Sequence, residues 1–143
     1  MSRLRTRVAA LFATAALVTV APATAASADD GNGLPGCSVG EICFWYNADV
    51  RYQKQFWDTA NHSGNEFMDV GVPANSQYVR SGIPVQDHAW YATNRDTECR
   101  VRVGALDING VWQWDYIPRD SSASTRHWLT NTADRNDRHE RCV

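Results

Sequence analysis

The chain has 143 residues, enough for one domain of ordinary size, which excludes a large multidomain enzyme. Removing residues 1–28, which have the features of a signal peptide, takes away three of the 14 basic residues and none of the 16 acidic ones. The remaining 115 residues carry a net charge of about −5. This charge argues against binding nucleic acid through a basic surface and against electrostatic attachment to a membrane. We therefore expect neither among the partners.

The N-terminal region predicts secretion. Arg3, Arg5 and Arg7 form a positive segment, an apolar stretch over residues 8–20 follows, and Ala26-Ser27-Ala28 fits a cleavage site. The apolar stretch is shorter than the roughly 20 residues that a transmembrane helix needs. We expect an extracellular protein with a signal peptide over residues 1–28, a flexible, acidic and glycine-rich tail over 29–36, and one β-rich domain over 37–143, present as a monomer.

Four cysteines, an even number in a short secreted chain, predict two disulfides. Three pairings are possible. The short spacing between Cys37 and Cys43 favours a local bridge, which leaves Cys99 to pair with Cys142. No spacing typical of a structural zinc site occurs, so we expect no metal.

Strand-forming residues appear soon after Cys37. The run Ile42–Tyr46 ends at a turn signal, and Tyr52–Trp57 is the next expected strand. We expect loops over residues 58–65 and 74–84, with a short irregular strand over 67–73 between them. A third aromatic strand is expected over 88–92.

The clearest local pattern lies in the second half of the chain. Residues 99–103 alternate between apolar and arginine side chains, and Asn109-Gly110 separates this run from a second one over 111–117. Asn-Gly between alternating segments is the strongest short hairpin signal. A last strand is expected over 126–129, and the charged residues 131–141 are expected to form a surface loop or a single helical turn.

No convincing amphipathic helix occurs, and short strands separated by turns favour a small all-β sandwich or barrel. The expected domain opens with Cys37-Ser38-Val39-Gly40-Glu41-Ile42-Cys43-Phe44-Trp45, followed by a turn, Tyr52 and Phe56. This opening resembles the actinobacterial metalloproteinase-inhibitor family. Gln86-Asp87-His88-Ala89, Asn94 and Cys99-Arg100-Val101 are similar to later parts of that family's pattern. The resemblance covers roughly residues 37–103.

The resemblance implies a Greek-key, βγ-crystallin-like sandwich that binds an extracellular peptidase and performs no chemistry of its own. It implies Cys99, Arg100 and Val101 as the inhibitory segment; the alternative, which we favour, is a plain strand with only the arginine in water. Trp90 and Tyr91 stand where many relatives have calcium-binding serines, so no cofactor is expected.

Trp112, Trp114 and Tyr116 share one face of the second hairpin strand. Such a stripe is more often core, which is the interpretation we favour. The alternative is an exposed aromatic face that binds sugar rings or an apolar partner. On this reading the protein would be a non-inhibitory, crystallin-like module that binds cell-wall glycan or another surface partner.

A small secreted hydrolase is the third hypothesis. Its acid–base groups would come from the four histidines and nearby glutamates: His62, His88, His127, His139, Glu41, Glu66, Glu98 and Glu140. The adjacent His139-Glu140-Arg141 has the residue types of a small nuclease site, but consecutive strand residues do not point in one direction. No serine-hydrolase, zinc-protease or phosphate-loop motif occurs. We therefore expect a binding protein rather than an enzyme.

Overall fold

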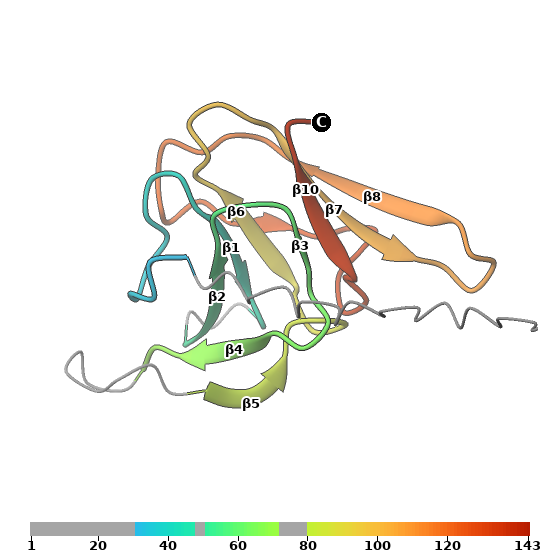
Figure 1. Cartoon of the computed structure of the whole chain (residues 1–143), viewed down its shortest axis with the longest axis horizontal. Helices are drawn as coiled ribbons and strands as arrows, with labels where there is room; N and C mark the ends of the chain where they lie inside the picture. Colours follow the sequence, from blue (N-terminus) through green and yellow to red (C-terminus); the bar gives the residue numbers. More distant parts are fainter. Residues whose placement is uncertain (1–30, 48–50, 72–79) are drawn as a thin grey trace, which may run out of the picture.

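The computed structural model describes residues 31–47, 51–71 and 80–143, and these ranges form ten β-strands in two antiparallel sheets (Figure 1). The predicted signal peptide and its cleavage site lie outside the described residues. The all-β class is confirmed, as are both disulfides, Cys37–Cys43 and Cys99–Cys142. In these ranges no helix is long and apolar enough to cross a membrane. The two disulfides are consistent with an extracellular location.

The larger sheet has six strands in the order β5-β4-β2-β1-β6-β9. The strands are β1 (Ile42–Trp45), β2 (Tyr52–Phe56), β4 (Glu66–Asp69), β5 (Arg80–Pro84), β6 (Tyr91–Asn94) and β9 (His127–Trp128). Strand β1 pairs with β2 on one side and with β6 on the other. All four of its residues are buried, which explains the unbroken run of strand-forming residues. Ile42 and Phe44 face the main core, and Cys43 and Trp45 pack on the opposite face of the sheet.

The smaller sheet has four strands in the order β3-β10-β7-β8. They are β3 (Ala60–Asn61), β10 (Arg138–Arg141), β7 (Val101–Leu106) and β8 (Trp112–Ile117). The predicted Asn109-Gly110 turn joins β7 to β8, and Gly110 has a positive φ of 76°. The β7–β8 hairpin projects beyond the rest of the molecule (Figure 1).

The main core lies between the two sheets. It follows the predicted alternation in β7, where Val101 and Val103 face inward and Arg102 faces outward. Its buried members come from both sheets and the loops between them: Ile42, Phe44, Phe56, Phe67, Val85, Ala89, Ala92, Val101, Val103, Ile117 and Leu129.

Three strands occur where the sequence predicted loops, and this part of the prediction was wrong. Strands β3 and β5 are edge strands, and edge strands tolerate the Gly82 and Pro84 of β5 because one side needs no backbone partner. Strand β10 carries charges at three of its four positions, so it lacks an apolar alternation. Its inward residue is a histidine, His139, whose ring is fully buried.

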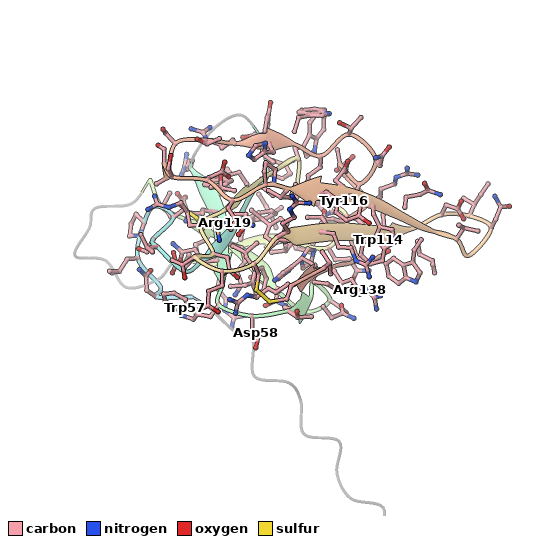
Figure 2. The ribbon with its side chains drawn as sticks, turned by 90° about the horizontal axis from the view of Figure 1, so that it is seen from above. Trp57, Asp58, Trp114, Tyr116, Arg119 and Arg138 are labelled. Atoms are coloured by element: carbon pink, nitrogen blue, oxygen red, sulfur yellow. A yellow bond between two sulfur atoms is a disulfide. The ribbon has the colours of Figure 1, made fainter. Side chains whose placement is uncertain are left out.

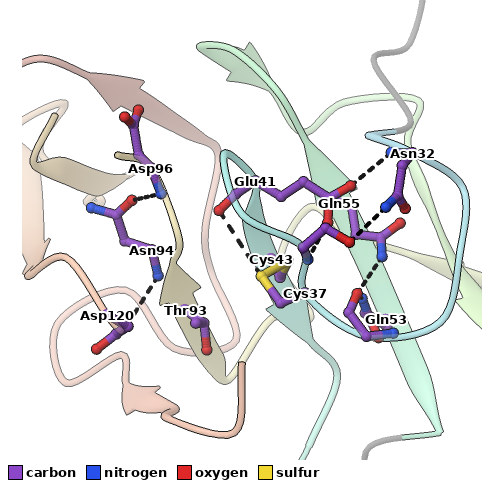
Figure 3. Close-up of a disulfide and its surroundings, with 12 residues drawn as sticks. Asn32, Cys37, Glu41, Cys43, Gln53, Gln55, Thr93, Asn94, Asp96 and Asp120 are labelled. Atoms are coloured by element: carbon purple, nitrogen blue, oxygen red, sulfur yellow. Dashed lines mark hydrogen bonds between the residues drawn. A yellow bond between two sulfur atoms is a disulfide. The ribbon is translucent and has the colours of Figure 1, made fainter. Parts of the chain in front are cut away.

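The N-terminal segment also differs from the expected flexible tail. Residues 31–36 lie across the outer face of β1 and β2, where hydrogen bonds hold them (Figure 3). The Gln53 side chain both accepts from the Gly36 N–H and donates to its carbonyl. Gln55 donates to the carbonyls of Leu34 and Gly36. Two glutamines of β2 therefore fix a segment whose composition alone indicates flexibility.

Candidate functional site

The predicted inhibitory segment, Cys99-Arg100-Val101, leads directly into β7. Cys99 is bonded to Cys142, and its N–H donates to the Asp96 carboxylate at 3.0 Å. Val101 is fully buried in the core, so of these three residues only Arg100 is exposed. A loop that enters a protease cleft has to expose several successive side chains. The segment therefore has the geometry of the plain strand that we favoured from the sequence.

The aromatic stripe of β8 lies on the outside of the smaller sheet, where we expected core. Tyr116 is 64% exposed, and Trp112 and Trp114 are half-buried. Apolar residues are usually the inward ones in such a strand, but here the inward face of β8 carries Asp115 and Ile117. The Asp115 carboxylate is buried because it accepts four hydrogen bonds from the backbone and side chains of residues 131 and 132. A buried, satisfied aspartate thus places the tryptophans on the outer face.

The two tryptophans form a stacked ladder with two arginines, which we call the Trp–Arg ladder: Arg102, Trp112, Trp114 and Arg138. The ring centroids of Trp112 and Trp114 are 5.4 Å apart, at an interplanar angle of 24°. The guanidinium carbon of Arg102 lies 3.9 Å from the Trp114 ring, and that of Arg138 lies 4.1 Å from the Trp112 ring. Figure 2 shows Trp114, Tyr116 and Arg138 on this side of the molecule.

Glu140 of β10 forms ion pairs with both arginines of the Trp–Arg ladder. Glu140 accepts from Arg102 at 2.6 Å and, through its other oxygen, from Arg138 at 2.6 Å. Gly104 of β7 pairs with Trp114 of β8 on one side and with Arg138 of β10 on the other, so β7 places no side chain between these two residues. The guanidinium groups stack on ring faces, so the ladder is a braced surface rather than a free platform. Arginine, tryptophan and tyrosine are also the residues most often found at the energetic centres of protein interfaces.

The tip of the β7–β8 hairpin is a functional candidate that the sequence reasoning missed. Ile108 is 101% exposed, and Leu106 and Val111 flank it at 48% and 54%. The signal in the sequence was Ile108 itself, which lies in the turn Asp107-Ile108-Asn109-Gly110, because turns of this kind normally carry polar residues. The tip therefore presents three aliphatic side chains to solvent at the end of a projecting hairpin.

The Asp107 carboxylate holds this tip in one conformation. One oxygen accepts from the N–H groups of Asn109 and Val111, at 2.8 and 2.9 Å. The Asp107 backbone pairs with Val111 and Gly110. The hydrogen bond from the Val111 N–H, followed by that from Asn109, lowers the pKa of Asp107 below its ordinary value. The tip is thus an ordered loop with exposed apolar side chains.

Two of the four candidate histidines, His62 and His139, form a buried pair that does not reach solvent. His62 and His139 are fully buried, with His62 Nε2 and His139 Nδ1 2.9 Å apart. Asn136 Nδ2 can only donate, and it lies 2.6 Å from His62 Nδ1, so that nitrogen accepts. The proton of His62 is then on Nε2 and points to His139, which donates through its own Nε2 to the Asp58 carbonyl at 2.7 Å.

This tautomer assignment follows from the hydrogen-bond network and makes both rings neutral. Burial, and secondarily the nearby His139, lowers the pKa of His62 well below 6.5. The Asn136 amide completes the network, since it also donates to the Val85 carbonyl and accepts from the Ala89 N–H. The pair therefore stabilises the core and has no path to a substrate.

The remaining acid–base candidates do not converge. In His139-Glu140-Arg141 the histidine points inward, Glu140 joins the Trp–Arg ladder, and Arg141 pairs with the buried Asp96 at 2.5 Å. Burial alone would raise the pKa of Asp96, but the bond from Arg141 lowers it overall. His127 pairs instead with Asp120 at 2.9 Å on the larger sheet.

Cys37, Glu41 and Cys43 bring three metal-type donor groups within 4.8 Å of one another, beside the N-terminal segment (Figure 3). The two sulfurs are bonded to each other and so are not thiolate ligands. The Glu41 carboxylate accepts from the N–H groups of Asn32 and Ser38, both at 2.7 Å. This cluster therefore anchors the N-terminal segment.

The predicted site residues thus lie in separate places: Cys99, Arg100 and Val101 at the start of β7, and Trp112, Trp114 and Tyr116 on the outer face of β8. The β7–β8 hairpin connects them and carries the exposed tip. Comparison of the chain with protein-family models, with curated proteins and with solved structures gives no match.

Proposed function

We propose that the protein is a secreted binding protein that inserts the tip of its β7–β8 hairpin into an apolar pocket of an extracellular protease. The observation that carries this proposal is Ile108, a large aliphatic side chain that is 101% exposed at the end of a projecting hairpin. Burying such a side chain in a partner gains about 1.5–3 kcal/mol. The resemblance of residues 37–103 to metalloproteinase inhibitors supports a protease as the partner.

The order of the tip supports insertion into a cleft. Binding energy is lost when a loop has to be ordered on association, and the Asp107 carboxylate has already fixed Asn109 and Val111 in the free protein. A loop held in this way also resists the distortion that hydrolysis of its own backbone requires. The ladder side chains on β7 and β8 stiffen the hairpin behind the tip.

The position of the tip revises the inhibitory segment implied by the resemblance. Arg100 lies at the opposite end of β7 from Ile108, and its neighbour Val101 is buried. Leu106, Ile108 and Val111 expose apolar side chains around one turn, and residues 108–111 are exposed in succession. We therefore assign protease contact to residues 106–111 in place of Cys99-Arg100-Val101.

The test is a titration of the mature protein against a panel of secreted proteases that includes a thermolysin-like metalloprotease. Stoichiometric loss of peptidase activity is expected for at least one of them. Ile108→Asp should weaken inhibition by at least about tenfold, because it places a charge in the apolar pocket. Asp107→Ala should weaken it less and make the hairpin susceptible to cleavage.

The matched control is Val39→Asp, which changes an apolar side chain that is 58% exposed on another loop. It should inhibit as the unchanged protein does. Absence of inhibition of every protease at a tens-fold molar excess would overturn the proposal. Equal inhibition by Ile108→Asp and the unchanged protein would overturn the assignment to the tip.

A further inference from the structure

A groove of about 600 Å³ lies beside the outer end of the hairpin, where Leu106 pairs with Trp112 just before the turn. Trp112 and Leu106 form its wall on the hairpin side. The polar groups come from the end of β3, from the loop after β5 and from the residue before β10: Asn61, Gln86, Asp87 and Asp137. Sites for small molecules have volumes of about 300–1,000 Å³ and combine an apolar wall with a few convergent polar groups.

Hydrogen bonds hold the two sides of the groove together. The Asp137 carboxylate accepts from the Leu106 N–H at 2.7 Å on the hairpin side and from Gln86 Nε2 at 3.0 Å on the other side. The Asp137 N–H donates to the Gly104 carbonyl at 2.8 Å. The groove therefore exists before any ligand binds, which removes the cost of forming it.

The lining is acidic. Asp87 and Asp137 contribute two carboxylates, and Arg135 is the basic residue among those that line the groove. Arg138, which stacks on Trp112, is paired with Glu140. The Arg135 guanidinium donates twice to the Asn131 carbonyl, at 2.7 and 2.9 Å, and is thereby held to its own turn. Burial and then the neighbouring Asp137 raise the pKa of Asp87, in keeping with a crowded acidic environment. A cationic ligand is favoured by this charge, and an anionic one is opposed.

The remaining lining matches a sugar better than a peptide. Asn61, Ser63 and Gln86 provide amide and hydroxyl groups, as the hydroxyls of a saccharide require. Gln86 Nε2 already donates to Asp137 and Asn61 Oδ1 already accepts from the Ser63 N–H, while each side chain has further donor or acceptor capacity. Trp114 and Arg138 stack on Trp112, and the part of the ring that still lines the groove offers aromatic surface for the apolar C–H face of a sugar ring. A peptide that binds by β-strand addition would instead need a row of unpaired backbone groups along the groove.

We propose that this groove binds a short oligosaccharide of amino sugars that carry free amines, with a ring packed against Trp112 and an ammonium group beside Asp87. This site shares Leu106 with the hairpin tip but does not include Ile108, and it does not rest on the proposed protease-binding function. It gives the protein a second partner class, a cationic cell-wall or extracellular glycan.

The test is isothermal titration of the full mature chain with a glucosamine tetramer at pH 6 and low salt. Measurable binding is expected. Trp112→Ala should weaken it by at least about tenfold, and Trp112→Phe should restore part of that loss. Asp87→Asn should weaken it about tenfold, because the ammonium group loses its charged partner.

The chain offers a matched control for each substitution. Trp114 stacks on Trp112 but does not line the groove, so Trp114→Ala should change affinity by less than about threefold. Asp134, like Asp87, is exposed and has a positive φ (56° against 62°), which asparagine tolerates. Asp134 does not line the groove, but its charge acts on Asp87, so Asp134→Asn should weaken binding by less than about threefold. Ile108→Asp should leave binding unchanged, which separates this site from the protease contact.

Four outcomes would overturn the proposal. The first is no binding of the tetramer at millimolar concentration. The second is equal binding of the N-acetylated tetramer, which lacks the amines. The third is tighter binding of tetralysine, which would make the groove a site for cationic peptides. The fourth is equal loss in Trp114→Ala and Trp112→Ala, which would trace the effect to the Trp–Arg ladder.

Discussion

The two faces of the smaller sheet use polar side chains in opposite ways, and β10 contributes to both. Its inward residue, His139, belongs to a fully enclosed chain of hydrogen bonds that runs from Asn136 through His62 to the Asp58 carbonyl. Its outward residues, Arg138 and Glu140, belong to an ionic and aromatic surface that is partly in water.

The difference between the two faces is one of tolerance. A buried donor or acceptor that loses its partner costs about 1–3 kcal/mol, because water cannot replace that partner. Exposed ion pairs and cation–π contacts contribute about 1 kcal/mol or less, because water competes for the same groups. We therefore expect the inner network to determine stability and the outer surface to tolerate substitution.

Asn136→Ala should give the largest effect. It leaves His62 Nδ1, the Val85 carbonyl and the Ala89 N–H without their partner inside the core, so the free energy of unfolding should fall by about 3 kcal/mol. Urea denaturation with the disulfides intact measures it. Arg138→Ala, from the outer face, is the control and should cost about 1 kcal/mol. Equal losses in the two variants would remove the proposed distinction between the faces.

The pH dependence of stability should give the next largest effect. Burial, followed by His139, holds the pKa of His62 well below 6.5, whereas the unfolded chain keeps about 6.5. Below that pH the unfolded state binds a proton that the folded state does not, so stability is present above pH 6.5 and falls as the pH drops. The slope should approach about 1.4 kcal/mol per pH unit.

Urea midpoints between pH 7.5 and 5 measure this slope. In His62→Gln, which has no titrating ring at this position, the slope should flatten. A slope in that variant equal to the slope of the unchanged protein would assign the acid sensitivity to other groups.

Sequence reasoning predicted the all-β class, both disulfides and the Asn109-Gly110 hairpin, because each depends on local or compositional signals. It missed β10, because that strand's inward position is filled by a histidine whose partners come from residues 58 and 62, far away in the chain. A polar network between distant segments leaves no periodic pattern in either one.

The assignment of the Trp112, Trp114 and Tyr116 stripe to the core was wrong for a related reason. Alternation shows that the three share a face, but it does not say which face is inside. That choice depends on Asp115, whose burial is stabilised by the turn at residues 131 and 132. The groove was also beyond sequence reasoning, since its lining residues are spread from position 61 to position 137.

The smallest expected effect concerns the packing of the outer face itself. A Cβ added to Gly104 would lie 2.5 Å from the Trp114 ring, and that ring is held by Arg102 and Trp112 and has little room to move. Gly104→Ala should therefore destabilise the protein by about 1–2 kcal/mol. With Trp114→Ala as background the clash is absent, and alanine loses less backbone entropy on folding than glycine does. The same change should there be neutral or stabilising by up to about 1 kcal/mol. A double-mutant cycle by urea denaturation measures this change of sign, and equal destabilisation in both backgrounds would mean that Gly104 is required by the strand and not by the ladder.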